Sequence, residues 1–191
     1  MNFDLDQYNK VEPKEFGEYE TLESGGHIVE IVDAREHKSK FSDNISLKVS
    51  VDTTKTDKQP GFFKARYDAD TNKDKKWPNG GTKYLSLAND QLAFFKGFIT
   101  ALENSNPGFK FNTKGNWEQL KGLKLAAQFG QEEFEKQDKS IGLATKLIGF
   151  RSLDKLNEIK VPNIKKLEPQ PTSDMLEDFK DVVEIDDNFL D

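Results

Sequence analysis

Hydrophobic and polar residues alternate along several segments of this 191-residue chain. The clearest is residues 45–51, where Ile, Leu and Val alternate with Ser and Lys without interruption. This pattern is typical of a β-strand that buries one face and exposes the other. Similar patterns predict strands at residues 27–35, 83–87, 122–130 and 141–151.

Residues 62–67 predict a further strand. In an extended conformation Phe62, Lys64 and Arg66 share one face, which then combines an aromatic ring with two cations. The connection that follows, residues 68–82, is polar and longer than most loops inside compact domains. Loops of that length are often functional or disordered.

A single helix is predicted near the middle of the chain, from about residue 89 to residue 104. Apolar residues recur there at helical spacing and predict a face that packs on the core. These residues are Leu92, Phe95, Ile99 and Leu102, with Phe94 and Phe98 widening the same face. Asn89 or Asp90 is the expected N-cap, and the Pro-Gly pair at residues 107–108 ends the helix.

The order of these elements predicts the fold class. A mainly β protein is expected, with an OB-fold-like Greek-key barrel of five to six strands and one α-helix. A β-sandwich has a comparable number of strands but does not require the helix. Residues 1–25 form an acidic arm that is partly packed, residues 26–167 form the barrel domain, and residues 168–191 form a proline-containing linker and a flexible acidic tail.

Charge is distributed unevenly along the chain. Residues 167–191 contain nine carboxylates and one lysine, whereas residues 35–166 contain 25 Lys and Arg against 16 Asp and Glu. A net charge of −6 for the whole chain therefore conceals a cationic middle between acidic ends. A cationic body favours a polyanionic partner, and a block of like charge at a chain end is typical of an interaction tail.

Catalytic and metal-binding patterns find little support in the sequence. The chain has no cysteine, and its two histidines, His27 and His37, lack a carboxylate pattern with metal-ligand spacing. No nucleophile elbow, phosphate-binding glycine loop or dinucleotide fingerprint is present. We therefore expect no enzymatic activity, no metal and no cofactor. With no secretion signal or membrane span in the sequence, a cytoplasmic location and no membrane partner are also expected.

Several segments combine aromatic residues with cations, as single-stranded nucleic-acid binding requires. Bases stack on aromatic rings, and phosphates need positive partners. The candidate nucleic-acid-binding residues are Lys38, Lys40, Phe41, Lys48, Phe62, Lys64, Arg66, Lys75, Lys76, Trp77, Lys146, Phe150 and Arg151. The alternative for Phe62 and Phe150 is that they belong to the core while the lysines keep the surface soluble.

The acidic tail also contains hydrophobic residues, which a purely solubilising tail would not need. Its candidate partner-binding residues are Phe179, Asp186, Asp187, Phe189 and Leu190. The apolar side chains would enter a groove on a partner protein while the carboxylates meet its basic rim. The alternative is an amphipathic helix that docks on the chain's own domain.

Several motifs resemble one family. They are Phe94-Phe95-Lys96-Gly97-Phe98, residues 105–109, Trp117, residues 120–122, residues 130–134 and Val161-Pro162. Across about residues 15–167 these look like small phage-encoded proteins identified as single-stranded DNA-binding proteins or left as domains of unknown function. The acidic tail independently resembles the tails of bacterial and phage single-stranded DNA-binding proteins. Those tails typically end in an aromatic residue, whereas Phe189 here is followed by Leu190 and Asp191.

The resemblance implies a sequence-tolerant single-stranded DNA-binding protein that acts in phage DNA replication or recombination, in the cytoplasm of the host cell. Its expected partners are single-stranded DNA and, through the tail, replication and recombination proteins, with a homo-oligomer left open. One alternative is a protein that anneals strands or mediates recombination. Another is a protein-interaction module whose acidic ends mimic nucleic acid.

Overall fold

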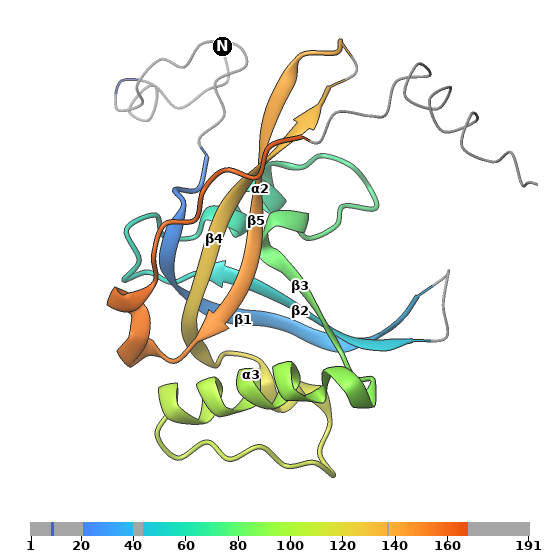
Figure 1. Cartoon of the computed structure of the whole chain (residues 1–191), viewed down its shortest axis with the longest axis vertical. Coiled ribbons are helices and arrows are strands. Elements are labelled where there is room, and N and C mark those ends of the chain that lie inside the picture. The colour runs from blue at the N-terminus through green and yellow to red at the C-terminus, as the bar shows by residue number, and fades with distance from the viewer. Residues whose placement is uncertain (1–8, 10–20, 40–43, 137, 168–191) are drawn as a thin grey trace, which may run out of the picture.

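The computed structural model describes residues 9, 21–39, 44–136 and 138–167. The strands are β1 (Gly25–Lys38), β2 (Ile45–Thr53), β3 (Thr82–Ser86), β4 (Lys124–Glu135) and β5 (Ile141–Arg151), and the α-helices are α2 (Phe62–Ala69) and α3 (Leu92–Ser105) (Figure 1). Short 3₁₀ helices lie at Asn79–Gly81, Asn89–Gln91, Trp117–Leu120 and Leu153–Glu158. The described part is thus mainly β, and five of the six predicted strands are confirmed.

The five strands form one antiparallel sheet in the order β3-β2-β1-β4-β5. β1 is the central strand, and register shifts interrupt its pairing with β2 and the pairing of β4 with β5. Such bulges increase local bending and twist. The edge strands β3 and β5 approach within 8 Å between Cα atoms, but no pairing joins them. The sheet is therefore open rather than closed into a barrel.

The core lies inside the curve of the sheet, and α3 covers one end of it (Figure 1). Phe98, Ile99 and Leu102 of α3 are buried and Phe95 packs against the core, which confirms most of the predicted core face of this helix. Leu92 was predicted on the same face but is 40% exposed in the first turn. The expectation that Phe94 widens this face is wrong, because Phe94 is 78% exposed in the first turn of α3. The predicted N-cap is also wrong, since the cap residue is Gln91 and it makes no side-chain capping hydrogen bond.

The segment predicted as a strand at residues 62–67 is the helix α2. Its first backbone N–H groups are satisfied by the end of β2: Asp52 Oδ1 accepts hydrogen bonds from Phe63 N (2.9 Å) and Lys64 N (3.2 Å), and Thr53 Oγ1 accepts from Phe62 N (2.9 Å). Helices begin where such donors find acceptors. The acceptors lie about ten residues upstream, so the local alternation of the sequence does not reveal them.

Two glycines hold the connection after α2 close to β5. A Cβ atom on Gly80 would lie 2.9 Å from the carbonyl oxygen of Thr145, and one on Gly81 would lie 2.8 Å from the ring of Phe63. Only glycine permits this approach, since real Cβ atoms essentially never come that close. The Gly80-Gly81 pair therefore places residues of the long loop beside α2 and β5.

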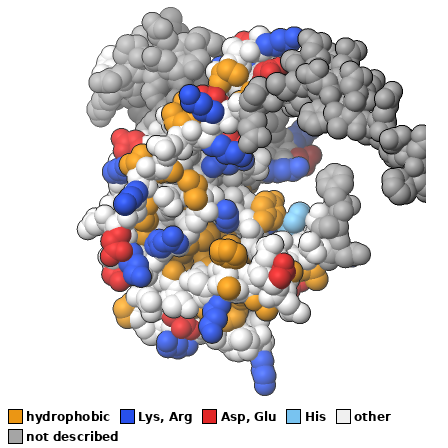
Figure 2. Space-filling model, viewed as in Figure 1, with side chains coloured by type: hydrophobic (Ala, Val, Ile, Leu, Met, Phe, Trp, Pro, Cys, Tyr) orange, Lys and Arg blue, Asp and Glu red, His pale blue; other side chains and the backbone are white. Residues whose placement is uncertain are grey.

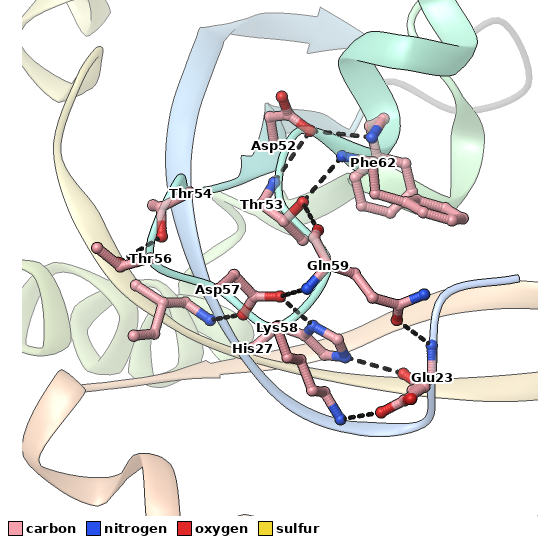
Figure 3. A network of polar contacts seen from close by, with 12 residues as sticks. Glu23, His27, Asp52, Thr53, Thr54, Thr56, Asp57, Lys58, Gln59 and Phe62 are labelled. Atoms are coloured by element: carbon pink, nitrogen blue, oxygen red, sulfur yellow. Dashed lines mark hydrogen bonds and ion pairs between the residues drawn. The ribbon is translucent and has the colours of Figure 1, made fainter. Parts of the chain in front are cut away.

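A buried polar network joins the start of β1 to the loop after β2 (Figure 3). The His27 side chain is 0% exposed; its Nδ1 lies 2.9 Å from Asp57 Oδ1, and its Nε2 lies 2.9 Å from the carbonyl oxygen of Glu23. Both contacts of the ring are oxygen acceptors, so a ring nitrogen that carries a proton has an acceptor within hydrogen-bond distance. Lys58 pairs with the Glu23 carboxylate at 2.5 Å on the exposed side of the network.

Asp57 receives more hydrogen bonds than the one from His27. Burial acts to raise the pKa of its carboxyl, but hydrogen bonds from His27 and from the backbone N–H groups of Gln59 and Ile28 outweigh burial and hold the pKa below its usual value. The carboxylate is thus the charged centre that fixes this loop on β1.

Candidate nucleic-acid interface

Tyr84 is an exposed aromatic residue on the outer face of the sheet, and sequence reasoning missed it. In the strand register Arg35 of β1 lies opposite Lys48 of β2, and Lys48 lies opposite Tyr84 of β3. Residues directly opposite one another share a face of the sheet. The Tyr84 ring is 48% exposed, with Lys48 Nζ 6.0 Å and the His37 ring 4.9 Å from its centroid. This face therefore offers a ring for stacking with cations beside it.

An open cavity of about 580 Å³ lies within the loop after α2. Its lining includes Lys73, Lys75, Lys76 and Trp77 together with the carboxylates Asp70 and Asp74. Trp77 Nε1–H donates to the carbonyl oxygen of Val51 at 3.1 Å, and its ring lies 5.4 Å from that of Tyr67. Because its indole is half-buried by these contacts, Trp77 anchors the loop to the sheet. Lys75 Nζ sits 4.5 Å from the centre of the Tyr67 ring.

A second cavity, of about 440 Å³, joins this loop to α2 and β5. Arg66 of α2 and Lys146 of β5 both line it, and Pro78 and Asn79 line this cavity and the first one. The two cavities are therefore neighbours. Three segments contribute cations to this side of the molecule: α2, the loop that follows it, and the distant strand β5.

A groove of about 580 Å³ lies between β3, α3 and β5. Its cationic lining residues are Lys83, Arg151 and Lys155, and its exposed aromatic residues are Tyr84 and Phe94. Burial lowers the pKa of Lys83, and the charge of Lys146 lowers it further, so the two amines are close enough to repel each other. Lysine and arginine side chains surround hydrophobic ones on the face drawn in Figure 2.

We call the row Arg35, Lys48 and Tyr84, the two cavities and the groove the β3 band, because β3 or the loop before it contributes to each part. Of the predicted residues, the β3 band contains Lys48, Arg66, Lys75, Lys76, Trp77, Lys146 and Arg151. The structure thus brings together cations that the sequence distributes over more than 100 positions.

The predicted exposed faces around Phe62 and Phe150 are wrong. Phe62 is 6% exposed because it begins a helix and turns into the core, and the Arg66 guanidinium covers its ring at 4.5 Å. Phe150 is 8% exposed and lies 4.9 Å from the Phe98 ring. The bulge in the β4–β5 register leaves Ile148 without a partner, which reverses the alternation and turns Phe150 inward.

Two predicted cations are partly neutralised by carboxylates. Lys64 Nζ lies 2.7 Å from Asp68 Oδ2, and this hydrogen bond raises the pKa of Lys64. Lys146 Nζ lies 3.3 Å from Glu132 Oε2, a carboxylate that it shares with Lys165 at 3.7 Å. Both pairs are exposed, so either lysine can exchange its carboxylate for a phosphate at little cost.

The remaining predicted residues lie at or beyond the ends of the described segments. Lys38 is exposed at the end of β1, with an interaction partner in the structure. Lys40 and Phe41 lie outside the described residues. So do the predicted tail residues Phe179, Asp186, Asp187, Phe189 and Leu190.

No family model matches the chain, and no curated protein matches it significantly. Within the described segments, no group of three or more His, Asp or Glu side chains is placed to hold a metal ion. In the same part of the chain, none of the helices has the length and apolar character needed to cross a membrane.

Proposed function

We propose that this chain is a sequence-tolerant single-stranded DNA-binding protein, without catalysis, that acts in DNA replication or recombination. The observation that carries the proposal is the β3 band, where the exposed Tyr84 ring lies beside Lys48 and lines a groove with Lys83, Arg151 and Lys155. Cations of α2, β5 and the long loop line the two cavities of the same band. Bases of any sequence stack on aromatic rings, and phosphates of any sequence are attracted to cations. The location expected for this role is the cytoplasm of a phage-infected cell.

The strand order supports an oligonucleotide-binding type of fold. β1 pairs with both β2 and β4, and the main helix lies between β3 and β4 in the chain. An OB-fold is a partly open five-stranded Greek-key barrel that binds its ligand on the face of its second and third strands. Lys48 of β2 and Tyr84 of β3 occupy the outer face of those two strands here.

Replacing Tyr84 with alanine should weaken binding to dT oligomers by about 1–3 kcal/mol, the cost of one lost stacking contact. Tyr84→Phe keeps the ring and should bind almost as well as the wild type. Fluorescence anisotropy with labelled dT oligomers measures both variants. Equal affinity of Tyr84→Ala and Tyr84→Phe would show that the bound DNA does not stack on Tyr84.

The acidic tail should compete with DNA for the cationic β3 band and should also contact other replication or recombination proteins. A chain truncated at about residue 168 lacks most of the carboxylates of residues 167–191 and should therefore bind dT more tightly at low salt. The difference should shrink as salt screens the charges. Mobility shifts of full-length and truncated protein measure it, and equal affinities at low salt would exclude competition.

Two outcomes would favour the alternative functions. Acceleration of duplex formation between complementary strands would identify an annealing protein, and an annealing assay detects it. Failure of the full-length protein to bind dT at about 50 mM salt would instead favour a module whose acidic ends mimic nucleic acid, since most non-specific binding is electrostatic.

A further inference from the structure

The groove between β3, α3 and β5 has an unusual composition for this chain. Lys83, Arg151 and Lys155 contribute three cations to it, while none of its described lining residues is an Asp or Glu. The whole chain contains 34 Asp and Glu against 28 Lys and Arg. A concave surface that carries only positive charge attracts anions more strongly than a flat one, because its walls focus the field.

Lys83 is held in the groove without a counter-charge. It lies on the same face of β3 as the buried Leu85, opposite Val49 of β2. Within the described residues its ammonium has no hydrogen bond or ion pair, and the second cation Lys146 is close enough to lower its pKa. A half-buried charged group normally has a partner, since its desolvation is otherwise uncompensated. An anion that enters the groove would supply such a partner to Lys83.

The walls of the groove leave room for a ring-sized group. Gly97 of α3 and Gly149 of β5 both line it, and a Cβ atom built on either would meet no atom within 4 Å. Phe94 lies one helical turn before Gly97 and is 78% exposed. An apolar ring with open space beside it is a suitable surface for stacking a base.

We propose that this groove binds one nucleotide of a bound single strand, with a phosphate on Lys83 and a base against Phe94. The inference rests on the proposed function and adds to it a defined site next to α3. Arg151 and Lys155 flank the groove and attract the neighbouring phosphates. Tyr84 lines the groove and also lies on the outer face of the sheet. The bound DNA therefore passes from the groove to that outer face around the edge strand β3.

Binding in the groove should be linked to proton uptake. In the free protein burial and Lys146 lower the pKa of Lys83, whereas a bound phosphate raises it. Affinity should therefore fall as the pH rises through the interval between the free and bound values. The other charged or titratable groups that line the groove are Arg151 of β5, Lys155 and Tyr84, and the described residues of α3 contribute none. Lys146 of β5 acts on Lys83 from outside the groove lining. Lys83→Arg should lose this dependence, since arginine stays protonated.

The test compares three full-length variants by anisotropy with a labelled dT oligomer. Lys83→Gln removes the phosphate contact, and Gly97→Leu fills the groove while improving helix propensity. Lys121→Gln is the control, because it removes an equal charge at an exposed position outside the groove. We expect Lys83→Gln and Gly97→Leu to weaken binding by about tenfold or more, and Lys121→Gln by less than about twofold.

Salt titrations and unfolding curves complete the test. Lys83→Gln should reduce the slope of log affinity against log salt by about 0.7, the value for one phosphate contact to a single strand. Gly97→Leu should unfold at or above the wild-type temperature, so that its weak binding reports a blocked groove. Wild-type affinity and salt slope in Lys83→Gln, together with wild-type affinity in Gly97→Leu, would overturn the proposed nucleotide site in the groove. The proposed function would remain intact. Absence of dT binding by the wild type would overturn both.

Discussion

Raising the salt concentration from about 50 mM to about 200 mM should weaken binding to dT oligomers by on the order of 10³-fold. The β3 band offers Lys48, Arg66, Lys75, Lys76, Lys83, Lys146, Arg151 and Lys155 to the phosphates of a strand. Each phosphate contact releases a condensed counterion, so the loss of affinity grows with the number of contacts. Anisotropy titrations over a series of salt concentrations give the slope directly.

The control for this prediction is the Tyr84→Ala variant. Stacking releases few ions, so this variant should bind more weakly at every salt concentration while keeping the wild-type slope. A charge variant such as Lys83→Gln should do the opposite and reduce the slope. An affinity that does not change with salt would show that the cations of the β3 band do not contact phosphate.

Replacing Asp57 with asparagine should lower the free energy of unfolding by about 1–3 kcal/mol, which is typical for leaving a buried hydrogen-bond donor without an acceptor. Asp57 is 3% exposed at its side chain, and its carboxylate serves His27 as well as two backbone N–H groups. The neutral amide offers only one acceptor atom and no charge, so at least one of the donors from His27, Ile28 and Gln59 loses its acceptor. Urea unfolding followed by Trp fluorescence measures the difference.

The pH dependence of this variant provides a second check. Because the folded-state pKa of Asp57 lies below its unfolded value, the stability it contributes is complete above the unfolded value of about 4 and is lost as the pH falls through the folded value. The gap between wild type and Asp57→Asn should narrow over that acidic interval. A gap that stays constant there would show that the Asp57 charge does not stabilise the fold.

Lys58→Gln is the matched control for the same network. It breaks only the exposed pair between Lys58 and Glu23, whose side chains are 46% and 63% exposed. Exposed pairs typically contribute no more than about 1 kcal/mol, so this variant should unfold close to the wild type. A loss of unfolding free energy as large as that of Asp57→Asn would show that the exposed pair stabilises the network as much as the buried Asp57 does.

The strands that follow a simple alternation could be predicted from the sequence, whereas the interruptions could not. Residues 45–51 become part of β2 because their alternation is complete and local. The bulge at Ile148 depends on how β5 pairs with β4, and it turns Phe150 from the expected exposed face into the core. Face assignments based on period two hold only up to the first bulge.

The candidate site divides in the same way. Six cations of the β3 band were predicted from the sequence, because charge and composition do not depend on folding: Lys48, Arg66, Lys75, Lys76, Lys146 and Arg151. Arg35 and Lys155 were not predicted. Tyr84, Phe94 and Lys83 were missed, although Lys83 and Tyr84 lie in a strand that was predicted. Their importance depends on the register of β3 with β2 and on the position of α3, which join residues far apart in the chain.

The sequence by itself therefore determined the mainly β character of the chain, the position of α3 and the cationic middle, since these depend on periodicity and composition within short segments. Only the tertiary structure decided that residues 62–69 are helical, because the acceptors for their N–H groups are Asp52 and Thr53 at the end of another element. It also decided which rings are exposed and which cations share a surface. Those properties arise from contacts between segments that are distant in the sequence, so the local pattern of hydrophobic and polar residues does not predict them.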